Sequence, residues 1–414
     1  MTLPTLLLVA DEVRQVRSGV GTYGRLLLRG LIERGLSPVV ATWEAERDPG
    51  GFPELEWISL GKRPRLDPTP GAFLSLGRRI GPALAGRDFG LIHFLDARGA
   101  HAFLPADGPA GAKVIGTVHD DYAARAPASA FGLFGRAADP LRRWLYYRWL
   151  ARLEARTYPR LELLMTNARA TSTSLVERYG IARELLREIP LTIHVPEPCG
   201  AATPLEGEPA LLFSGGNFYR KGLDLLLRAA GSLQSRLPGI HVHVAGEDRA
   251  RSRIAALAGK AGMRERLSFH GRLAPADMAR MLRGADQFVM PSRREALGLV
   301  YLEAFHAGIP VIAGSEGGVA ELVGDEASGL LVPREDVPAL AHAIERLWLD
   351  AELAARLVAG GRRVLAARSV DRFLDATLAA YRSMGVVPAG SLVAGPSREG
   401  RLESSSSRPA GSSS

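Results

Sequence analysis

Short apolar runs alternate with helical spacing along most of the chain. The apolar runs are typical of buried strands, which we predict at 3–10, 39–42, 57–60, 91–95, 113–118, 161–166, 210–213, 242–245, 267–270, 287–290 and 310–313. Helical spacing is found at 19–34, 131–160, 167–179, 297–307, 336–349, 352–366 and 370–383, and onward from 223 and 319. Because strands and helices alternate, the expected fold class is α/β, with open parallel sheets.

The length of 414 residues predicts two domains, each large enough for its own core. A region rich in Pro, Gly and Ala near the middle of the chain predicts the boundary. We therefore expect a first domain at 1–195, a linker at 196–209 and a second domain at 210–369. Residues 385–414 are dominated by Pro, Gly, Ser and Arg, which predicts a disordered tail. Residues 61–71, rich in Pro and Arg, predict a loop.

The formal net charge is +8, and the pI is near 9.9. Such a balance suits an anionic partner, which could be nucleic acid, an acidic membrane surface or a phosphorylated substrate. The sequence has no zinc knuckle, basic zipper or aromatic ribonucleoprotein motif, so a nucleic-acid partner is not expected. One cysteine, Cys199, excludes an intramolecular disulfide and fits a reducing compartment.

The apolar run at 3–10 is too short to span a membrane, lacks a basic leader and continues into Asp11 and Glu12. We expect it to be a buried strand of a cytoplasmic protein. His241 and His243 are close in sequence, but strand alternation accounts for them. Neither a Cys nor an acidic residue completes a metal site beside them, so no metal is expected.

The most informative stretch follows the strand at 287–290. Glu295 lies in the turn and Glu303 lies in the next helix. Backbone N–H groups at 297–299 would be unpaired at the helix start and placed to hold a phosphate, and those at 317–318 would offer a second set nearby. A carboxylate repels a phosphate, so the two glutamates should meet hydroxyl groups instead. This pattern predicts a ligand that carries both phosphates and sugar hydroxyls.

A second phosphate-binding pattern follows the strand at 210–213. Small residues, among them Gly216, would let the backbone approach a phosphate, and Lys221 would meet its charge as a compact cation. The spacing is not that of a Walker A loop. The alternative is an ordinary solvated lysine at a helix start.

Two features of the first half point to the same crevice. Gly19 and Gly21 form a Gly-rich turn between the first strand and the first helix, but the full dinucleotide pattern is missing because Arg25 follows Gly24. His119 ends the strand at 113–118, where a titratable side chain faces the crevice. The alternatives are glycines needed only for tight turning and a structural histidine.

Residues 131–160 are basic and aromatic. Apolar side chains recur every four residues on one helical face, at Leu141, Leu145, Trp149 and Leu153. A neighbouring basic stripe contains Arg148, Arg152 and Arg156, and aromatic surface is added by Phe131, Phe134, Trp144, Tyr146 and Tyr147. Such a helix can lie on an anionic membrane, which predicts peripheral contact with the inner face of the cytoplasmic membrane. The alternative is an amphipathic helix with solvated arginines.

The string from 291 to 311 resembles the signature of the retaining glycosyltransferases of family 4, within the two-domain GT-B class. The signature reads P-S-x-x-E-x-x-G-L-x-x-x-E-A-x-x-x-G-x-P-V, and the matching residues are Pro291, Ser292, Glu295, Gly298, Leu299, Glu303, Ala304, Gly308, Pro310 and Val311. The resemblance covers about residues 1–384 and is strongest over 210–332.

The resemblance implies two Rossmann-like domains facing a cleft, with the acceptor mainly on the first domain, the donor mainly on the second and a last helix at 370–384 crossing back. It implies transfer of a sugar from a nucleoside-diphosphate sugar to an acceptor hydroxyl, with retention at the anomeric carbon and without cofactor or metal. Together with the basic helix, it suggests lipopolysaccharide or another cell-surface glycan as the acceptor.

The resemblance also implies individual functions. Glu295 would hold sugar hydroxyls near the reacting face, Glu303 would hold the ribose, and His119 would hydrogen-bond the donor sugar or orient the acceptor. The other donor-binding positions that it implies are Gly19, Gly21, Arg169, Gly216, Lys221, Arg272, Leu297, Gly298 and Leu299.

This chain departs from the family at one place, because many members have an arginine shortly before the position of Lys221. Gly215, Gly216 and Asn217 occupy that stretch here, so Arg169 or Arg220 would supply the second positive charge. Two other functions stay open: a glycoside phosphorylase of the same fold class, although no pyridoxal-lysine motif is found, and a non-catalytic nucleotide- or anion-binding protein.

Overall fold

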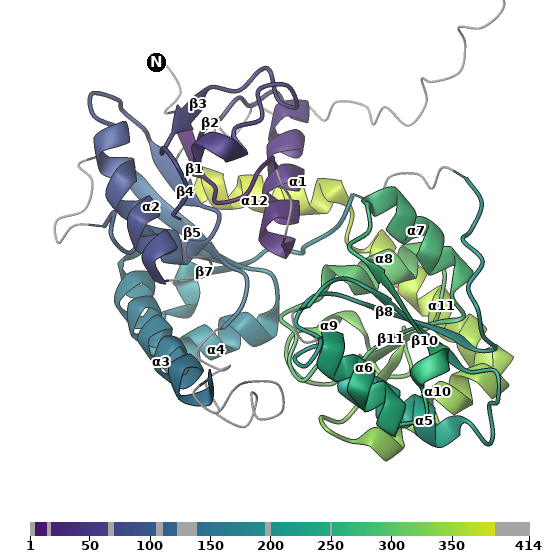
Figure 1. Ribbon diagram of the computed structural model, residues 1–414. Helices are drawn as coiled ribbons and strands as arrows, with labels where there is room; N and C mark the ends of the chain where they lie inside the picture. Colours follow the sequence, from purple (N-terminus) through teal and green to yellow (C-terminus); the bar gives the residue numbers. More distant parts are fainter. Residues whose placement is uncertain are drawn as a thin grey trace, which may run out of the picture.

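The computed structural model describes residues 5–14, 18–64, 70–104, 111–121, 139–194, 200–248 and 251–385. Two parallel sheets, each flanked by helices, form two Rossmann-like domains (Figure 1). The α/β fold class is thereby confirmed. Outside the described residues lie the predicted tail from residue 386 onward, Phe131, Phe134, Cys199 and the first residues of the predicted linker.

The first domain contains a seven-stranded sheet in the order β3-β2-β1-β4-β5-β6-β7. Its strands are β1 (Leu6–Val9), β2 (Val39–Thr42), β3 (Trp57–Ser59), β4 (Leu91–Phe94), β5 (Lys113–Val118), β6 (Leu163–Thr166) and β7 (Leu186–Glu188). Its α-helices are α1 (Gly19–Glu33), α2 (Pro70–Ala83), α3 (Asp139–Thr157) and α4 (Arg169–Tyr179). Strand β1 pairs with both neighbours, with Leu8 opposite Val40 of β2 on one side and His93 of β4 on the other.

The second domain contains a six-stranded sheet in the order β10-β9-β8-β11-β12-β13. Its strands are β8 (Ala210–Ser214), β9 (His241–Ala245), β10 (Leu267–Gly271), β11 (Gln287–Met290), β12 (Val311–Gly314) and β13 (Leu330–Val332). Its α-helices are α5 (Leu223–Leu233), α6 (Arg251–Lys260), α7 (Pro275–Gly284), α8 (Leu299–Ala307), α9 (Val319–Leu322), α10 (Val337–Leu349) and α11 (Ala351–Ala366). Short 3-10 helices are η1 (Glu44–Glu46), η2 (Ala97–Ala100), η5 (Tyr158–Arg160), η6 (Arg183–Leu185) and η7 (Arg264–Arg266).

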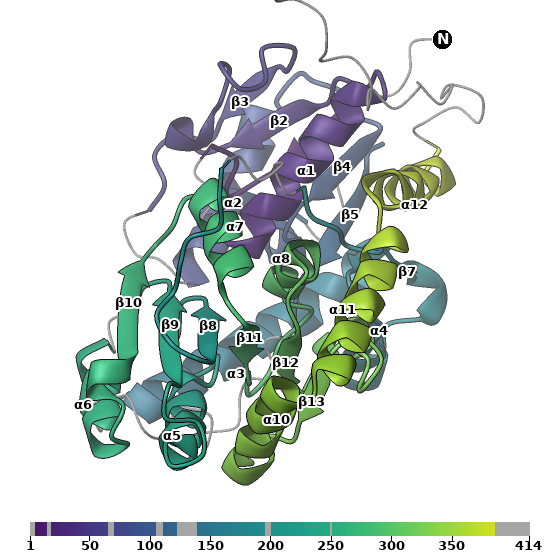
Figure 2. The ribbon, with the colours of Figure 1, turned by 90° about the vertical axis from the view of Figure 1, so that its right-hand side faces the viewer.

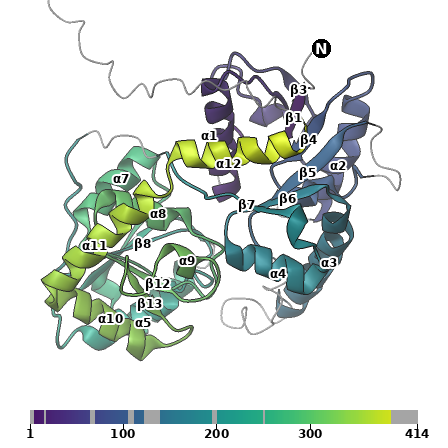
Figure 3. The same cartoon turned by 180° about the vertical axis from the view of Figure 1, so that it is seen from behind.

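The last helix, α12 (Val370–Ser383), leaves the second domain and packs on the first (Figures 2 and 3). Leu374 lies directly against Gly30 of α1, where a larger residue than glycine would collide with it. Arg34 forms ion pairs with Asp371 at 2.7 Å and Asp375 at 2.9 Å. The crossing helix implied by the family resemblance is thus confirmed.

Three elements differ from the sequence predictions. The predicted loop at 61–71 overlaps the start of α2. This helix was not predicted, because its glycines and Pro82 have low helix propensity. Strands β7 and β13 were not predicted, because each has three residues and lies at a sheet edge.

Among the described helices, none combines the length and the apolar character needed to cross a bilayer.

The apolar face predicted for the helix at 131–160 is partly wrong. The structure places α3 at 139–157, and Leu145 is 53% exposed on it. The buried side of the helix runs through Leu150, Leu153 and Glu154, so the packed face is rotated from the predicted one. The arginines of the predicted basic stripe, Arg148, Arg152 and Arg156, are exposed.

Candidate active site

Lys221 and Glu295, two of the predicted site residues, lie where the strand order of the second sheet reverses. The chain passes from β8 outward to β10 and then returns to β11 on the other side of β8. The loop after β8 carries Lys221 and the loop after β11 carries Glu295. In an open parallel sheet the crevice outside the carboxyl ends of two such strands is the preferred ligand site.

The carboxylate of Glu295 lies between two cations of the other loop. Lys221 Nζ forms an ion pair with Glu295 Oε2, and Arg220 Nη1 lies 3.4 Å from the same oxygen. The side chains of Lys221 and Glu295 are 12% and 10% exposed. Arg220 therefore stands beside Lys221, and it is one of the two residues, with Arg169, from which the family resemblance implied a second positive charge.

Two hydrogen bonds to backbone N–H groups hold these loops in position. Asn217 Oδ1 accepts a hydrogen bond from Arg220 N at 3.1 Å, and Gly216 beside it is exposed toward solvent. Glu295 N donates to the Glu316 carbonyl at 3.0 Å, and Gly317 next to it has a φ of +98°. A side chain at Gly317 would collide with the Glu295 carbonyl, so glycine is required for this close approach.

The helix after Glu295 begins two residues later than predicted. Gly298 has a φ of +83° and is the N-cap of α8, so helical geometry starts at Leu299 while Leu297 is buried in the preceding turn. Within the described part of the chain, no side chain caps this helix start. A Cβ atom added at Gly19 would lie 3.7 Å from Leu299 Cδ1, which places the Gly-rich turn of the first domain beside the same helix start.

Gly21 lies in the first turn of α1, where its N–H group donates to Ser18 Oγ at 3.4 Å. Gly21 is buried, in contrast to its neighbour Gly19. The turn therefore presents Gly19, rather than Gly21, to the second domain.

Glu303 lines a cavity of about 230 Å³ between α7 and α8. Leu273 of the turn after β10 also lines the cavity. Both helices contribute apolar side chains, and the polar lining residues besides Glu303 are His194, Arg283 and His306. Burial raises the pKa of Glu303 to about 7. Arg272, next to Leu273, is exposed at the same turn. One carboxylate in a mainly apolar cavity suits a ligand with an apolar face and a few hydroxyl groups.

His119 lies at the carboxyl end of β5 in the first domain. Its Nε2 is 2.7 Å from the Leu95 carbonyl, and because a carbonyl can only accept, Nε2 carries the proton. Burial lowers the pKa of His119, so the ring is neutral near pH 7 and its Nδ1 is an acceptor. No hydrogen bond from the described residues reaches Nδ1. The ring of Tyr23 packs edge-on against His119 at a centroid distance of 4.9 Å.

Arg169 is the first residue of α4, and its side chain is exposed. Its backbone N–H and that of Ala170 bind the carboxylate of Glu321 from the second domain, at 2.9 and 2.6 Å. The helix start that carries Arg169 therefore already binds an anionic group of the chain itself. Unlike Arg220, Arg169 makes no described contact with Glu295.

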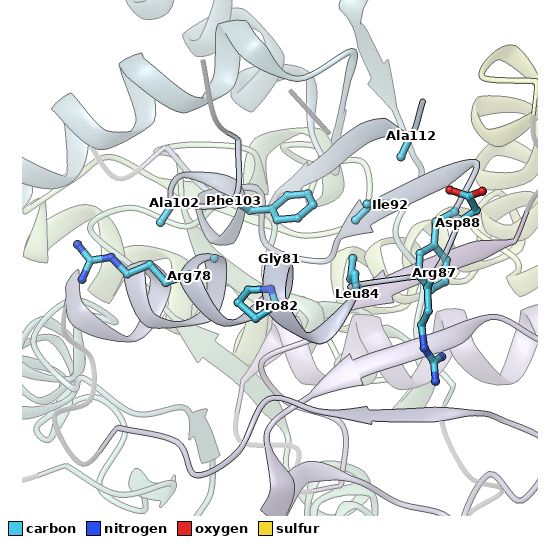
Figure 4. A pocket seen from close by; sticks show the side chains of 12 residues that line it. Arg78, Gly81, Pro82, Leu84, Arg87, Asp88, Ile92, Ala102, Phe103 and Ala112 are labelled. Atoms are coloured by element: carbon cyan, nitrogen blue, oxygen red, sulfur yellow. The ribbon is translucent and has the colours of Figure 1, made fainter. Parts of the chain in front are cut away.

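A larger cavity, of about 460 Å³, lies in the first domain between α2 and the residues that lead into β4 and β5. Phe103, Leu84 and Ile92 are at its centre, and Arg78 and Arg87 are toward its ends (Figure 4). It is next to the amino ends of the strands, opposite to the edge that carries His119. None of the predicted site residues is among the described residues that line it.

Sequence reasoning missed the ionic network beneath the loops, in which Arg293 binds Asp224 and Glu335. Arg293 occupies a variable position of the family signature, and its partners are distant in the sequence. The spacing of residues in the sequence therefore did not indicate a role for Arg293. In the residue ranges that the structure describes, no group of three or more His, Cys, Asp or Glu side chains is arranged to hold a metal ion.

Comparisons with known families match both halves of the chain. The family described as "Glycosyltransferase Family 4" matches residues 17–195, and "Glycosyl transferases group 1" matches residues 201–364. The Alpha-D-kanosaminyltransferase of Streptomyces kanamyceticus is 29% identical over 272 residues, which are 64% of this chain and 63% of that protein. The D-inositol 3-phosphate glycosyltransferase of Saccharomonospora viridis is 34% identical over 237 residues, which are 53% and 55% of the two chains. The chain thus matches little more than half the length of these relatives.

Solved structures share the architecture over nearly the whole chain. Sucrose-phosphate synthase from Thermosynechococcus elongatus superimposes with a TM-score of 0.76 at 21% identity, covering 92% of this chain and 99% of that one. Anabaena HepE in complex with UDP-glucose superimposes with a TM-score of 0.66 at 17% identity, covering 91% and 99%. At these identities the likeness concerns the fold. From the two family matches and this fold, the chain belongs to glycosyltransferase family 4 and has the GT-B architecture.

Proposed function

We propose that the protein is a retaining glycosyltransferase, which moves a sugar from a nucleoside-diphosphate sugar to an acceptor hydroxyl. The observation that carries this proposal is the pairing of two cations, Lys221 and Arg220, with Glu295 in front of the uncapped start of α8. This arrangement combines an anion site with a carboxylate that can hold hydroxyl groups. The complex of HepE with UDP-glucose supports a nucleotide-sugar donor for this fold.

In the proposed reaction the bond between the sugar and the diphosphate breaks while negative charge develops on the leaving group. Lys221, Arg220 and the N–H groups at the start of α8 would stabilise that charge without a metal or cofactor. Glu295 would then hold hydroxyls of the transferred sugar, and Glu303 would hold the ribose hydroxyls. The Nδ1 atom of neutral His119 would accept a hydrogen bond from the sugar or the acceptor. Closure of the cleft would limit hydrolysis of the donor.

The proposed acceptor is lipopolysaccharide or another cell-surface glycan, reached from the inner face of the cytoplasmic membrane. The exposed arginines Arg148, Arg152 and Arg156 support contact with anionic lipid, since they form one basic stripe on α3. Flotation with liposomes that contain or lack anionic lipid tests this part. Retention only on the anionic vesicles is expected, and absence from both would exclude the membrane contact.

The test of the main proposal is thermal stabilisation by UDP, GDP, ADP and dTDP. A ligand at about one hundred times its dissociation constant stabilises a protein by about 2.7 kcal/mol, which shifts the melting temperature measurably. We expect a shift with one of the four, and that nucleotide identifies the base of the donor. Turnover of the matching nucleotide sugars then identifies the sugar. A protein that none of the four stabilises would contradict the proposal.

A further inference from the structure

Arg293 is a buried arginine between the two loops of the candidate site. It follows β11, lies two residues before Glu295 and is 4% exposed. Its guanidinium binds Asp224 through two parallel hydrogen bonds, from Nη1 at 2.7 Å and from Nη2 at 2.8 Å. It also binds Glu335, from Nε at 2.5 Å and from Nη2 at 3.0 Å, and Nη1 donates to the Tyr219 carbonyl. All five N–H donors of the side chain are thereby used.

Arg293 and its partners belong to three separate connections that follow strands of the sheet. Tyr219 and Asp224 stand on either side of Lys221 in the sequence, and Glu335 precedes α10. The guanidinium also lies 3.8 Å from the centroid of the Tyr219 ring, within cation–π distance. One side chain thus joins the loop that carries Lys221 to the loop that carries Glu295.

The main chains of the two loops meet at the same place. Arg293 N donates to the Arg220 carbonyl at 2.9 Å. Gly222, the residue after Lys221, has a φ of +80°, and a side chain there would collide with the Pro291 carbonyl. The positions of Lys221 and Glu295 are therefore fixed by the same contacts that hold Arg293.

The charges of Arg293, Asp224 and Glu335 stabilise one another only while all three side chains are present. Burial by itself lowers the pKa of Arg293, but the hydrogen bonds with Asp224 and Glu335 outweigh burial and leave that pKa above its ordinary value. Asp224 is 3% exposed, so removal of the guanidinium alone would leave a buried carboxylate without its cation. Lysine restores the charge but offers three donors from one atom instead of a planar set of five.

We propose that Arg293 is a positioning residue of the sugar-transfer reaction, which sets the distance between the Lys221 ammonium and the Glu295 carboxylate without touching the substrate. This inference rests on the proposed glycosyltransferase function. Because Lys221 stabilises charge that develops on the leaving diphosphate, misplacing it weakens the transition state more than the bound ground state. The turnover number should therefore fall more than the donor KM rises.

The experiment compares Arg293→Lys with the wild type by isothermal titration with UDP and by release of UDP from UDP-glucose, with kcat and KM determined separately. GDP or another member of the panel replaces UDP if the wild type binds it instead. We expect kcat to fall by about ten- to hundredfold, while KM and the UDP dissociation constant change by less than about fivefold. The control is Ile254→Ala, a core substitution in α6 that lowers thermal stability outside the network. Both variants are assayed well below their melting temperatures.

Glu335→Gln provides a second variant in case Arg293→Lys does not fold. The side chain of Glu335 is 47% exposed, so its carboxylate can be replaced without burying an unpaired charge. It should show the same preferential loss of kcat on a smaller scale. Wild-type kcat in folded Arg293→Lys, or in Glu335→Gln if only that variant folds, overturns the inference. A wild type that binds no nucleoside diphosphate overturns the proposed function itself, and the inference with it.

Discussion

The ammonium group of Lys221 is paired with the carboxylate of Glu295, so the cation proposed to hold the diphosphate is bound to the acid proposed to hold the sugar. Both side chains are nearly buried, and Arg220 approaches the same oxygen. A diphosphate that binds Lys221 must therefore displace a carboxylate of the protein. Glu295 would become available for sugar hydroxyls only once phosphate has taken its place.

Substitution Glu295→Gln should consequently tighten the binding of UDP and slow sugar transfer. The amide keeps the shape of the side chain but no longer competes for Lys221, and it does not repel phosphate. We expect the UDP dissociation constant to fall by about three- to tenfold, as measured by isothermal titration, because partly buried charge pairs are worth about one kcal/mol or slightly more. Glu316→Gln is the control, since it removes a charge from the adjoining loop but not from the ion pair. Equal or weaker UDP binding by Glu295→Gln would refute the competition.

Arg220 and Arg169 can be separated as sources of the second positive charge. Arg220 Nη1 lies 3.4 Å from the oxygen that Lys221 also binds, whereas the helix start of Arg169 is bound to Glu321. Arg220→Ala should weaken UDP binding by about tenfold, a loss typical of a charge-assisted contact. Arg169→Ala should change it by less than about twofold. The reverse order in the two titrations would assign the diphosphate contact to the first domain.

The affinity for nucleotide should also depend on pH through Glu303. Burial raises the pKa of this carboxyl to about 7, and the ionised form accepts charge-assisted hydrogen bonds from the ribose hydroxyls, which are stronger than those to the neutral acid. From pH 6 to pH 8 the ionised fraction rises about tenfold, so the UDP dissociation constant should fall by up to about that factor. Glu303→Gln should bind more weakly at pH 8 and lose this part of the pH dependence. Titration of the phosphate itself is common to both proteins, so parallel profiles would argue against the ribose contact.

Apart from β7 and β13, the sequence predicted the strands of both sheets and the turns at their carboxyl ends, because those turns combine glycines with charged residues at fixed spacing. It placed Lys221 and Glu295 at one crevice, since parallel strands present their carboxyl ends at one edge. It did not predict that the two side chains would bind each other. Each was assigned a separate partner on the ligand, and without that ligand opposite charges at a partly buried site attract.

The contacts that support the two loops of the candidate site could not be predicted from the spacing of residues in the sequence. Arg293 lies 69 residues from Asp224 and 42 residues from Glu335 in the sequence, so only the folded sheet brings the three together. Helix α2 was missed for another reason, because Gly71, Gly77, Gly81 and Pro82 are poor helix formers whose conformation is determined by packing. Gly77 in particular lies against the backbone after η2, where a larger residue would not fit.

His93 gives a prediction about stability that is independent of any ligand. Its side chain is fully buried between β5 and α12. The Nδ1 atom is 2.7 Å from the Tyr381 hydroxyl of α12, and the Nε2 atom is 2.8 Å from Thr117 Oγ1 of β5. Burial, with a smaller contribution from His119, lowers the pKa of His93 to about 3. In the unfolded chain the imidazole of His93 therefore binds a proton near pH 6.5, whereas in the folded chain it stays neutral until the pH approaches 3.

Because the folded-state pKa of His93 is depressed, its contribution to stability is fully present above pH 6.5 and is lost as the pH falls toward 3. Between pH 7.5 and pH 5 this loss amounts to about 2 kcal/mol of unfolding free energy. His93→Gln lacks the titrating group and should not show this loss. When the pH is lowered from 7.5 to 5, the unfolding free energy of the variant should therefore rise relative to that of the wild type by about the same amount. Urea denaturation of both proteins at the two pH values measures the difference. A gap between wild type and variant that does not change with pH would show that His93 can be protonated in the folded protein.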